Sequence, residues 1–165
     1  MDTDRLISET PDADVEPAAP TALVVGHDGS GCASRALETA LQLATELGAP
    51  VPVARAWSMV TAPRPEGWTF GTVPSTDELA VAVTAELEAD VAAVVRRFPD
   101  VEVTCRAYHA GPARSLIEAS REARMLVVGS RGVGGLREMV LGSVSDQCVR
   151  YASCPVLVVR DRSED

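Results

Sequence analysis

The sequence predicts an α/β fold: an open five-stranded, mainly parallel sheet with helices on both faces, Rossmann-like in arrangement. Short apolar runs alternate along the chain with stretches of helical spacing, and this alternation is typical of βαβ units. Aromatic residues make up only 4% of a chain that is 46% hydrophobic, so Ala, Val and Leu must build the core. Such a core favours a buried parallel sheet over a sandwich or a barrel. At 165 residues there is room for one domain.

The first strand and helix follow an acidic segment, residues 1–20, which lacks periodicity and is expected to be a disordered tail. Thr21–Gly26 is a short apolar run that predicts a buried strand. Ser30 can cap a helix that continues to about Leu47, where Gly48 provides a stop signal.

The second strand is predicted at Val51–Trp57 by another short apolar run. Prolines and glycines in residues 58–74 predict a long loop. Ser75 and Glu78 have the spacing of a capping box and open a long helix to about Phe98. The remaining elements are expected in this order: an edge strand at Val101–Ala107, a helix at Pro112–Ala123, a strand at Met125–Gly129, a helix at Ser143–Tyr151 and a strand at Pro155–Arg160.

Most of the charge lies in the two ends of the chain. The net charge is −9, of which residues 1–20 carry −5 and residues 161–165 carry −2, so the body at residues 21–160 is nearly neutral. We therefore expect one folded domain at 21–160, a short charged tail at 161–165, and no nucleic-acid partner. All fifteen basic residues are Arg, and the lack of Lys excludes a P-loop and Schiff-base chemistry. No long apolar run or secretory signal is visible, so we expect no membrane association and a cytoplasmic location.

Glycines crowd the segment that follows the predicted strand Met125–Gly129. Residues 129–142 contain five glycines where an average composition gives about one. Gly142 and Ser143 lie where a helix begins, so free backbone N–H groups and the helix dipole favour an anion there. Ser143 and Ser145 add hydroxyl donors, and we interpret the segment as a phosphate cradle. The alternative is a flexible connection whose serines only cap the helix.

Asp28 lies just past the first predicted strand. Open parallel sheets bind ligands beyond the carboxyl ends of their strands, so this carboxylate is expected beside the cradle. It can accept hydrogen bonds from ribose hydroxyls or help to hold a metal ion bound to phosphates. Because Asp-Gly is also a common turn pair, a purely structural role stays open.

These residues carry a family resemblance. The spacing Gly129-x-x-Gly132, nine residues, then Gly142-Ser143 resembles the G-x2-G-x9-G-(S/T) signature of the nucleotide-binding universal stress proteins. The opening VVGHDGS is similar to the family's first strand and aspartate, although His27 occupies a position where an apolar residue is commoner. The resemblance covers about residues 21–160.

The resemblance implies a strand order of 3-2-1-4-5 and ATP as the ligand, with or without Mg. It implies that Asp28 binds the ribose and that Ala56 meets the adenine through its backbone. It also implies a homodimer formed through the last strand, Pro155–Arg160. The expected phosphate and ribose contacts are Gly129 and Gly132 around the ribose and phosphates, and Gly142, Ser143 and Ser145 at the β- and γ-phosphates.

The sequence therefore leads to the hypothesis of an ATP-binding regulatory or stress-response module. Turnover is expected to be slow or absent, because no activated nucleophile or water-positioning base is visible beside the cradle, and His109 has no orienting partner in the sequence. No catalytic residue and no protein metal site are assigned. The alternatives are an adenine-nucleotide-dependent enzyme on the same superfold, for ATP hydrolysis or adenylyl transfer, and a structural stress dimer that binds no nucleotide.

Overall fold

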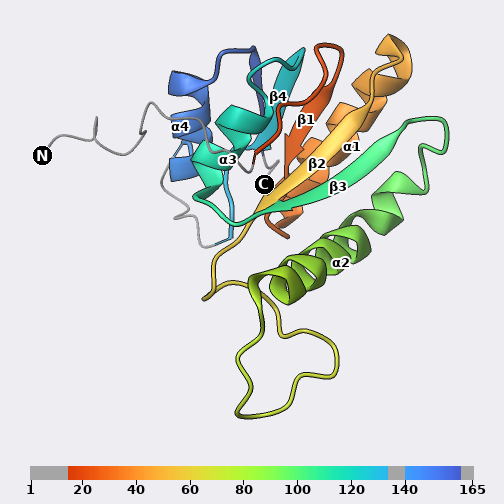
Figure 1. Ribbon diagram of the computed structural model, residues 1–165. Helices are drawn as coiled ribbons and strands as arrows, with labels where there is room; N and C mark the ends of the chain where they lie inside the picture. Colours follow the sequence, from red (N-terminus) through yellow and green to blue (C-terminus); the bar gives the residue numbers. More distant parts are fainter. Residues whose placement is uncertain (1–14, 134–139, 161–165) are drawn as a thin grey trace, which may run out of the picture.

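A computed structural model describes residues 15–133 and 140–160 (Figure 1). Strands and helices alternate through this part of the chain, as the sequence predicts. The elements are β1 (Leu23–Gly26), α1 (Gly31–Leu47), β2 (Val51–Ala56), α2 (Thr76–Val95), β3 (Val103–Tyr108), α3 (Pro112–Ala119), β4 (Met125–Gly129), α4 (Ser143–Tyr151) and β5 (Val156–Val159).

The five strands form one parallel sheet in the order β3-β2-β1-β4-β5, which confirms the predicted order. Val25 of β1 pairs with Val53 of β2 on one side and with Val127 of β4 on the other. Because all strands run the same way, the carboxyl ends of β1, β2 and β4 lie at one edge of the sheet. β3 and β5 are the two outer strands.

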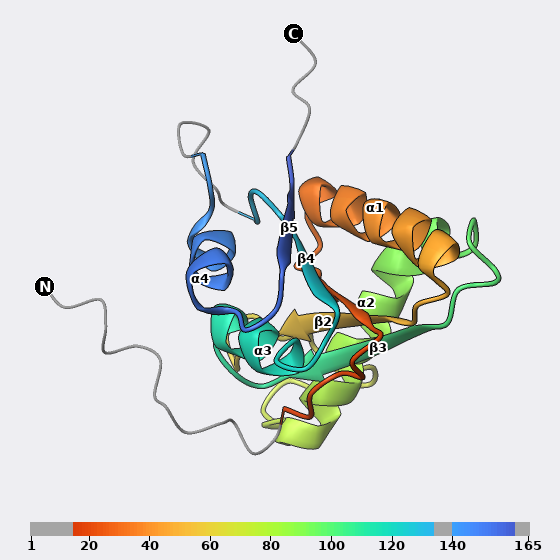
Figure 2. The same ribbon diagram turned by 90° about the horizontal axis from the view of Figure 1, so that it is seen from above.

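Helices cover both faces of the sheet. α1 and α2 pack on one face, and α3 and α4 pack on the other (Figure 2). The α1 and α2 face is closed by small and branched apolar side chains, as the composition predicts. Its fully buried members are Leu23, Val25, Ala36, Leu37, Ala40, Leu41, Val51, Val53, Leu87 and Val127.

The predicted caps of α1 and α2 are present. Ser30 Oγ accepts from Ala33 N at 3.1 Å, and Gly48 ends α1 in the left-handed conformation with φ 62°. Ser75 and Glu78 exchange both bonds of the capping box at the start of α2. α3 is shorter than predicted and ends at Ala119: its C-cap Ser120 has φ −95° and ψ 2°, and the next amide, Arg121 N, bonds to Glu118 O instead of continuing the helical pattern.

The segment before β1 is packed on the domain, so the predicted N-terminal tail is too long. Val15 is only 6% exposed, and Ala18 N donates to Ala119 O at 2.8 Å. Glu16 pairs with Arg106 of β3 at 3.1 Å. The segment covers an apolar cluster that includes Tyr108. The burial of this apolar surface stabilises the segment in its position on the domain. Residues 1–14 and 161–165 of the two predicted tails lie outside the described residues.

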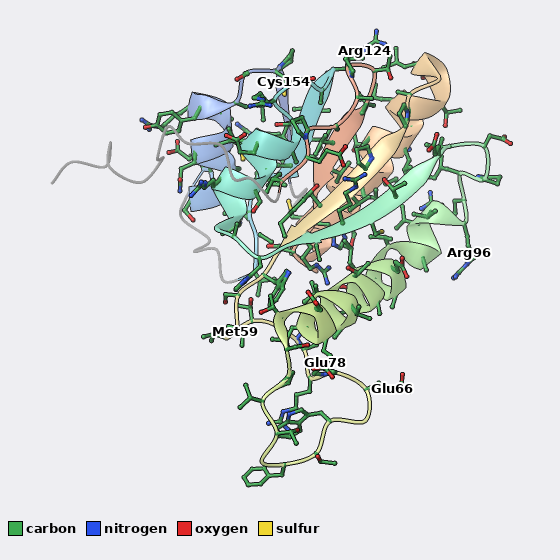
Figure 3. All side chains as sticks on the ribbon, viewed as in Figure 1. Met59, Glu66, Glu78, Arg96, Arg124 and Cys154 are labelled. Atoms are coloured by element: carbon green, nitrogen blue, oxygen red, sulfur yellow. The ribbon has the colours of Figure 1, made fainter. Side chains whose placement is uncertain are left out.

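The predicted loop between β2 and α2 projects from the body of the molecule. In Figure 3 it leaves near Met59, passes Glu66 and returns near Glu78. The Trp68 ring lies under the Arg64 guanidinium at 4.8 Å, and its Nε1 donates to Thr72 O at 2.9 Å, so the loop has contacts of its own.

Within the described ranges, no helix has the length and apolar character needed to cross a bilayer.

Candidate functional site

A cleft of about 730 Å³ opens at the carboxyl ends of β1, β2 and β4. This is the edge of an open parallel sheet where ligands bind, and the volume suits a small molecule. The structure brings together every residue that the sequence predicts for the site. The residues that line the cleft include Asp28, Ala56, Gly129, Gly132, Gly142, Ser143 and Ser145.

Two glycines permit close approaches at this edge. A Cβ atom on Gly129 would lie 2.9 Å from Cys32 Sγ, so the end of β4 can pack against the start of α1 only without a side chain. A Cβ atom on Gly132 would collide with the Asp28 carboxylate. Gly134 and Gly135, which contribute to the predicted glycine density, lie outside the described residues.

The N-terminus of α4 faces the cleft with its backbone. Gly142 is the N-cap, and no side chain caps this helix. The first helical bond runs from Asp146 N to Gly142 O at 2.9 Å, so the N–H groups of residues 143–145 have no acceptor within the helix. Ser143 is exposed beside them. These N–H groups and the helix dipole together favour an anion at this position.

Ser145 lines the cleft and also has contacts within the protein. Its side chain is buried, and its hydroxyl donates to Gly142 O at 3.0 Å and to Ser130 O at 3.2 Å. Gly142 N also donates to Ser130 O, at 2.7 Å. A hydroxyl has one proton, and here that proton is directed at backbone carbonyls. Ser145 therefore ties the start of α4 to the end of β4 and fixes the shape of the cradle.

Asp28 joins the loop after β1 to the glycine-rich loop after β4. Its Oδ1 accepts from Ser30 N at 3.0 Å, and its Oδ2 accepts from Val133 N at 2.8 Å. Partial burial raises the pKa of Asp28, but the hydrogen bonds from Ser30 and Val133 outweigh it and hold the pKa below its usual value. Asp28 is therefore a carboxylate at neutral pH, placed at the mouth of the cleft.

The opposite side of the cleft is formed by the end of β2 and by α2. Ala56 ends β2, and the next residue, Trp57, is 4% exposed and packs against Leu79 and Val83 of α2. The His109 ring stacks on Trp57 with 4.3 Å between centroids. Trp57 Nε1 is the one buried side-chain nitrogen or oxygen of the described residues without a hydrogen-bond partner.

A group of charged side chains that the sequence did not predict lies between β1, β2 and α2. Arg55 is 8% exposed and pairs with Asp90 at 2.7 Å and with Glu86 at 3.4 Å. Its Nε donates to His27 O at 3.0 Å. We call His27, Arg55, Glu86 and Asp90 the arginine cluster. Arg55, His27 and Glu86 also line the cleft.

His27 is neutral in this cluster. Burial lowers its pKa most, and the neighbouring Arg55 guanidinium lowers it further. The carboxylates of Asp28 and Asp90 act in the opposite direction but do not outweigh these two effects. One signal in the sequence could have revealed the cluster: Arg55 interrupts the apolar run at Val51–Trp57, and His27 directly follows the run at Thr21–Gly26.

Comparison with known proteins gives a consistent result. A family model described as the universal stress protein family matches residues 21–160. Universal stress protein Rv2005c of Mycobacterium tuberculosis is 36% identical over 138 residues, which are 84% of this chain and 45% of the relative. Universal stress protein YxiE of Bacillus subtilis is 31% identical over 144 residues, which are 84% of this chain and 97% of the relative. This chain thus spans about half the length of the mycobacterial protein.

A solved structure described as a universal stress protein in complex with cAMP has the same fold. It is 25% identical, the match covers 87% of this chain and 98% of that one, and the TM-score is 0.60.

Proposed function

The chain belongs to the universal stress protein family, and from this premise we propose that its cleft binds an adenine nucleotide, with ATP as the ligand. The observation that carries the proposal is the uncapped N-terminus of α4, which shares one cleft with the Asp28 carboxylate. The first feature suits phosphate oxygens, and the second suits the hydroxyl groups of a ribose. The related protein in complex with cAMP supports the choice of an adenine nucleotide.

In the proposed complex each part of ATP meets a different part of the cleft. The phosphates lie at Gly142 and Ser143, where a phosphate group can approach the backbone of α4 directly. The ribose lies at Asp28, beside Gly129 and Gly132, and the adenine lies at the backbone of Ala56.

A magnesium ion fits this cleft only as a companion of the phosphates. The described residues hold no cluster of three or more His, Cys, Asp or Glu side chains arranged for a metal ion. Asp28 is one of the two carboxylates of the described residues that line the cleft, and it already accepts two backbone N–H bonds. Any Mg would therefore be held mainly by phosphate oxygens, which is how this ion is usually bound.

We propose that the nucleotide regulates the protein and is turned over slowly or not at all. In the part of the chain that the structure describes, the titratable side chains that line the cleft are His27, Asp28, Arg55, Glu86 and Arg131. His27 and Glu86 both contact Arg55, and Asp28 accepts backbone N–H bonds, so these groups are engaged in the protein's own structure. Rapid phosphoryl transfer requires a positioned nucleophile and strong charge neutralisation, and these side chains do not provide them.

The test is to identify the small molecule that copurifies with the protein by mass spectrometry, and to titrate ATP, ADP, AMP and cAMP by calorimetry. We expect an adenine nucleotide to copurify and ATP to bind most tightly. A protein that binds none of the four would contradict the proposal. Rapid multiple turnover of ATP would contradict the regulatory role and favour an enzyme.

We also propose a homodimer formed along β5, the strand within the predicted segment Pro155–Arg160. β5 is an outer strand, and its residues Val156–Val159 are all only half-buried. Leu126 N donates to Pro155 O, and Ser130 N donates to Val159 O, so the odd-numbered residues bond to β4. The N–H and C=O of Val158 therefore point to the open edge, where a second chain can pair.

This alternation gives a clean test of the dimer. The variant Val158→Pro removes a donor from the open edge and spares the bonds to β4, so it is expected to yield folded monomers. Analytical ultracentrifugation of the wild type should show dimers at micromolar concentration, and circular dichroism checks the fold of the variant. A wild-type monomer at that concentration would end the proposal.

A further inference from the structure

The arginine cluster uses every nitrogen of one buried guanidinium. Arg55 Nε donates to His27 O at 3.0 Å, Nη1 donates to Glu86 at 3.4 Å, and Nη2 donates to Asp90 at 2.7 Å. Nη2 also lies 3.1 Å from His27 Nδ1. Burying a charge is unfavourable unless it is paired and hydrogen-bonded, and this set of partners meets that condition.

Two of these contacts reach the turn that presents Asp28. His27 immediately precedes Asp28, and its Nδ1 accepts from Gly29 N at 3.2 Å. Gly29 has φ 87°, a conformation that side chains rarely adopt, and Ser30 N bonds to Asp28 Oδ1. Residues 27–30 therefore form a sharp turn that Arg55 contacts from inside the protein, while Asp28 faces outward.

The hydrogen bonds also determine the tautomer of His27. Two donors, Gly29 N and Arg55 Nη2, converge on Nδ1, so this atom must carry the lone pair. The ring proton is then on Nε2, which lies 3.4 Å from Ser34 Oγ and donates to it. The turn is thus held from β2 through Arg55 and from α1 through Ser34.

We propose that Arg55 is a positioning residue for nucleotide binding: it holds the turn at residues 27–30 in the shape that presents the Asp28 carboxylate to the ribose. The proposal rests on the proposed function, because it requires a nucleoside beside Asp28. Arg55 itself touches the protein, and its effect on the ligand passes through Asp28.

A merely structural role leads to a different expectation. Buried ion pairs can often be replaced by apolar residues of similar volume with no loss of stability. If Arg55 only filled space, Arg55→Met would leave nucleotide binding unchanged. If Arg55 positions Asp28, the same variant weakens the binding of ATP even where the fold is intact.

The first measurement compares two ligands by calorimetry. For Arg55→Met we expect the Kd for ATP to rise about tenfold, the effect of losing the hydrogen bonds that hold a charged contact. The Kd for inorganic triphosphate should not change, since triphosphate meets only the N-terminus of α4. Arg97→Met is the matched control, because Arg97 pairs with Glu38 on the surface and does not line the cleft. It should bind both ligands like the wild type.

Arg55→Lys keeps the proposal testable if Arg55→Met does not fold. Lys retains the charge for Asp90 but lacks the planar fork that also reaches His27 O. We expect a severalfold rise in the Kd for ATP, with triphosphate binding unchanged. Wild-type ATP binding in both variants would overturn the proposal.

A double variant separates positioning from an independent effect. If Arg55 acts through Asp28, then Asp28→Ala combined with Arg55→Met should bind ATP no more weakly than Asp28→Ala alone. Losses that add in full would overturn the proposal, because Arg55 would then act without Asp28.

Hydrogen exchange tests the same idea without a ligand. In Arg55→Met, the amides of Gly29 and Ser30 should exchange at least about tenfold faster than in the wild type and in Arg97→Met. Unchanged exchange would overturn the positioning role. A wild type that binds no nucleotide but shows the expected exchange would remove the proposed function and leave Arg55 as the residue that holds this turn.

Discussion

The wall of the cleft formed by β4 and α4 includes glycines and the uncapped N-terminus of α4, so backbone N–H groups are open to the cleft there; we call it the backbone wall. The wall formed by β2 and α2 presents the side chains of Arg55, Trp57 and Glu86, and we call it the side-chain wall. On the first wall the contributors are glycines and an uncapped helix, all within residues 129–145. On the second wall they are Ala56, Trp57 and the arginine cluster, which come from β2, from α2 and from the segment that follows β1.

This difference assigns different tasks to the two walls. Phosphates are common to all nucleotides, so a backbone wall can bind them without contacting the base or the sugar. In the proposed complex, discrimination among nucleosides would come from the side-chain wall and from Asp28, which lies between the two. Substitutions on each wall should accordingly separate the binding of triphosphate from the binding of nucleoside.

The largest effect is expected from Gly142→Val on the backbone wall. A branched side chain would occupy the space of the β- and γ-phosphates and block the backbone of α4, so both ATP and triphosphate should lose at least about 100-fold in affinity. The fold should persist, because Gly142 has φ −70° and ψ 161°, which suit valine, and a Cβ atom would lie 3.5 Å from its nearest neighbour. Calorimetry measures binding, and circular dichroism measures folding.

Gly111→Val is the matched control for this substitution. Gly111 is the N-cap of α3, with φ −63° and ψ 138°, and a Cβ atom there would meet nothing within 4 Å. The control tests the same change at the same helical position outside the cleft, and it should bind ATP normally. Normal ATP binding by a folded Gly142→Val protein would contradict the phosphate cradle.

The next largest effect is expected between the two walls, at Asp28. Asp28→Ala should weaken ATP binding by roughly 1.5–3 kcal/mol, the range for losing hydrogen bonds to a charged group. Inorganic triphosphate should bind the variant and the wild type alike, because the ribose is the proposed contact. Asp100→Ala, at an exposed position outside the cleft, serves as the control. If triphosphate binding falls as much as ATP binding, Asp28 acts through a metal ion.

The same contrast explains how much the sequence could predict. The caps at Ser30 and Ser75, the stop at Gly48 and the strand order all depend on local spacing or on a family resemblance, and the structure confirms them. The backbone wall could also be predicted from the sequence, because its glycines lie close together in one segment.

The side-chain wall could not be predicted from the sequence. Arg55 and Asp90 are 35 residues apart, and only the packing of α2 on the sheet brings them within 2.7 Å. Ser145 shows the same limit on a smaller scale: its spacing from Gly142 is clear in the sequence, but the direction of its hydroxyl depends on how Ser130 lies beneath it.

A smaller effect is expected from pH, and it belongs to the side-chain wall. The pKa of His27 is lower in the folded protein than its ordinary value of about 6.5 in the unfolded chain. As the pH falls below about 6.5, His27 therefore takes up a proton in the unfolded chain before it does so in the folded protein. The contribution of His27 to stability should be constant above that value. Below it, stability should fall by at most about 1.4 kcal/mol per pH unit until the lower pKa of folded His27 is reached.

Urea unfolding between about pH 5 and 8 measures this slope. His27→Asn keeps an acceptor near Gly29 N and Arg55 but does not titrate, so it should lose the slope near pH 6. His109→Gln removes the chain's other histidine, which is exposed, and should keep the slope. Equal slopes in the wild type and His27→Asn would show that the arginine cluster does not depend on a neutral His27.

The smallest effects are expected from the two serines at the start of α4. Ser145→Ala removes a buried hydroxyl that donates to Gly142 O and Ser130 O, so it should cost about 1 kcal/mol in the free energy of unfolding and change ATP binding little. Ser143 is exposed and at the mouth of the cleft, so Ser143→Ala should leave stability unchanged and weaken ATP binding by about 1 kcal/mol or less.

Thermal unfolding and calorimetry on both serine variants separate these outcomes. Ser115→Ala is the control for stability, because its buried hydroxyl likewise donates to a helical carbonyl, Gly111 O, and lies outside the cleft. If Ser145→Ala abolishes ATP binding while its stability loss matches that of Ser115→Ala, the Ser145 hydroxyl must turn to the phosphates when ATP binds. The wall of β4 and α4 would then depend on side chains as well, and the contrast between the two walls would be one of degree.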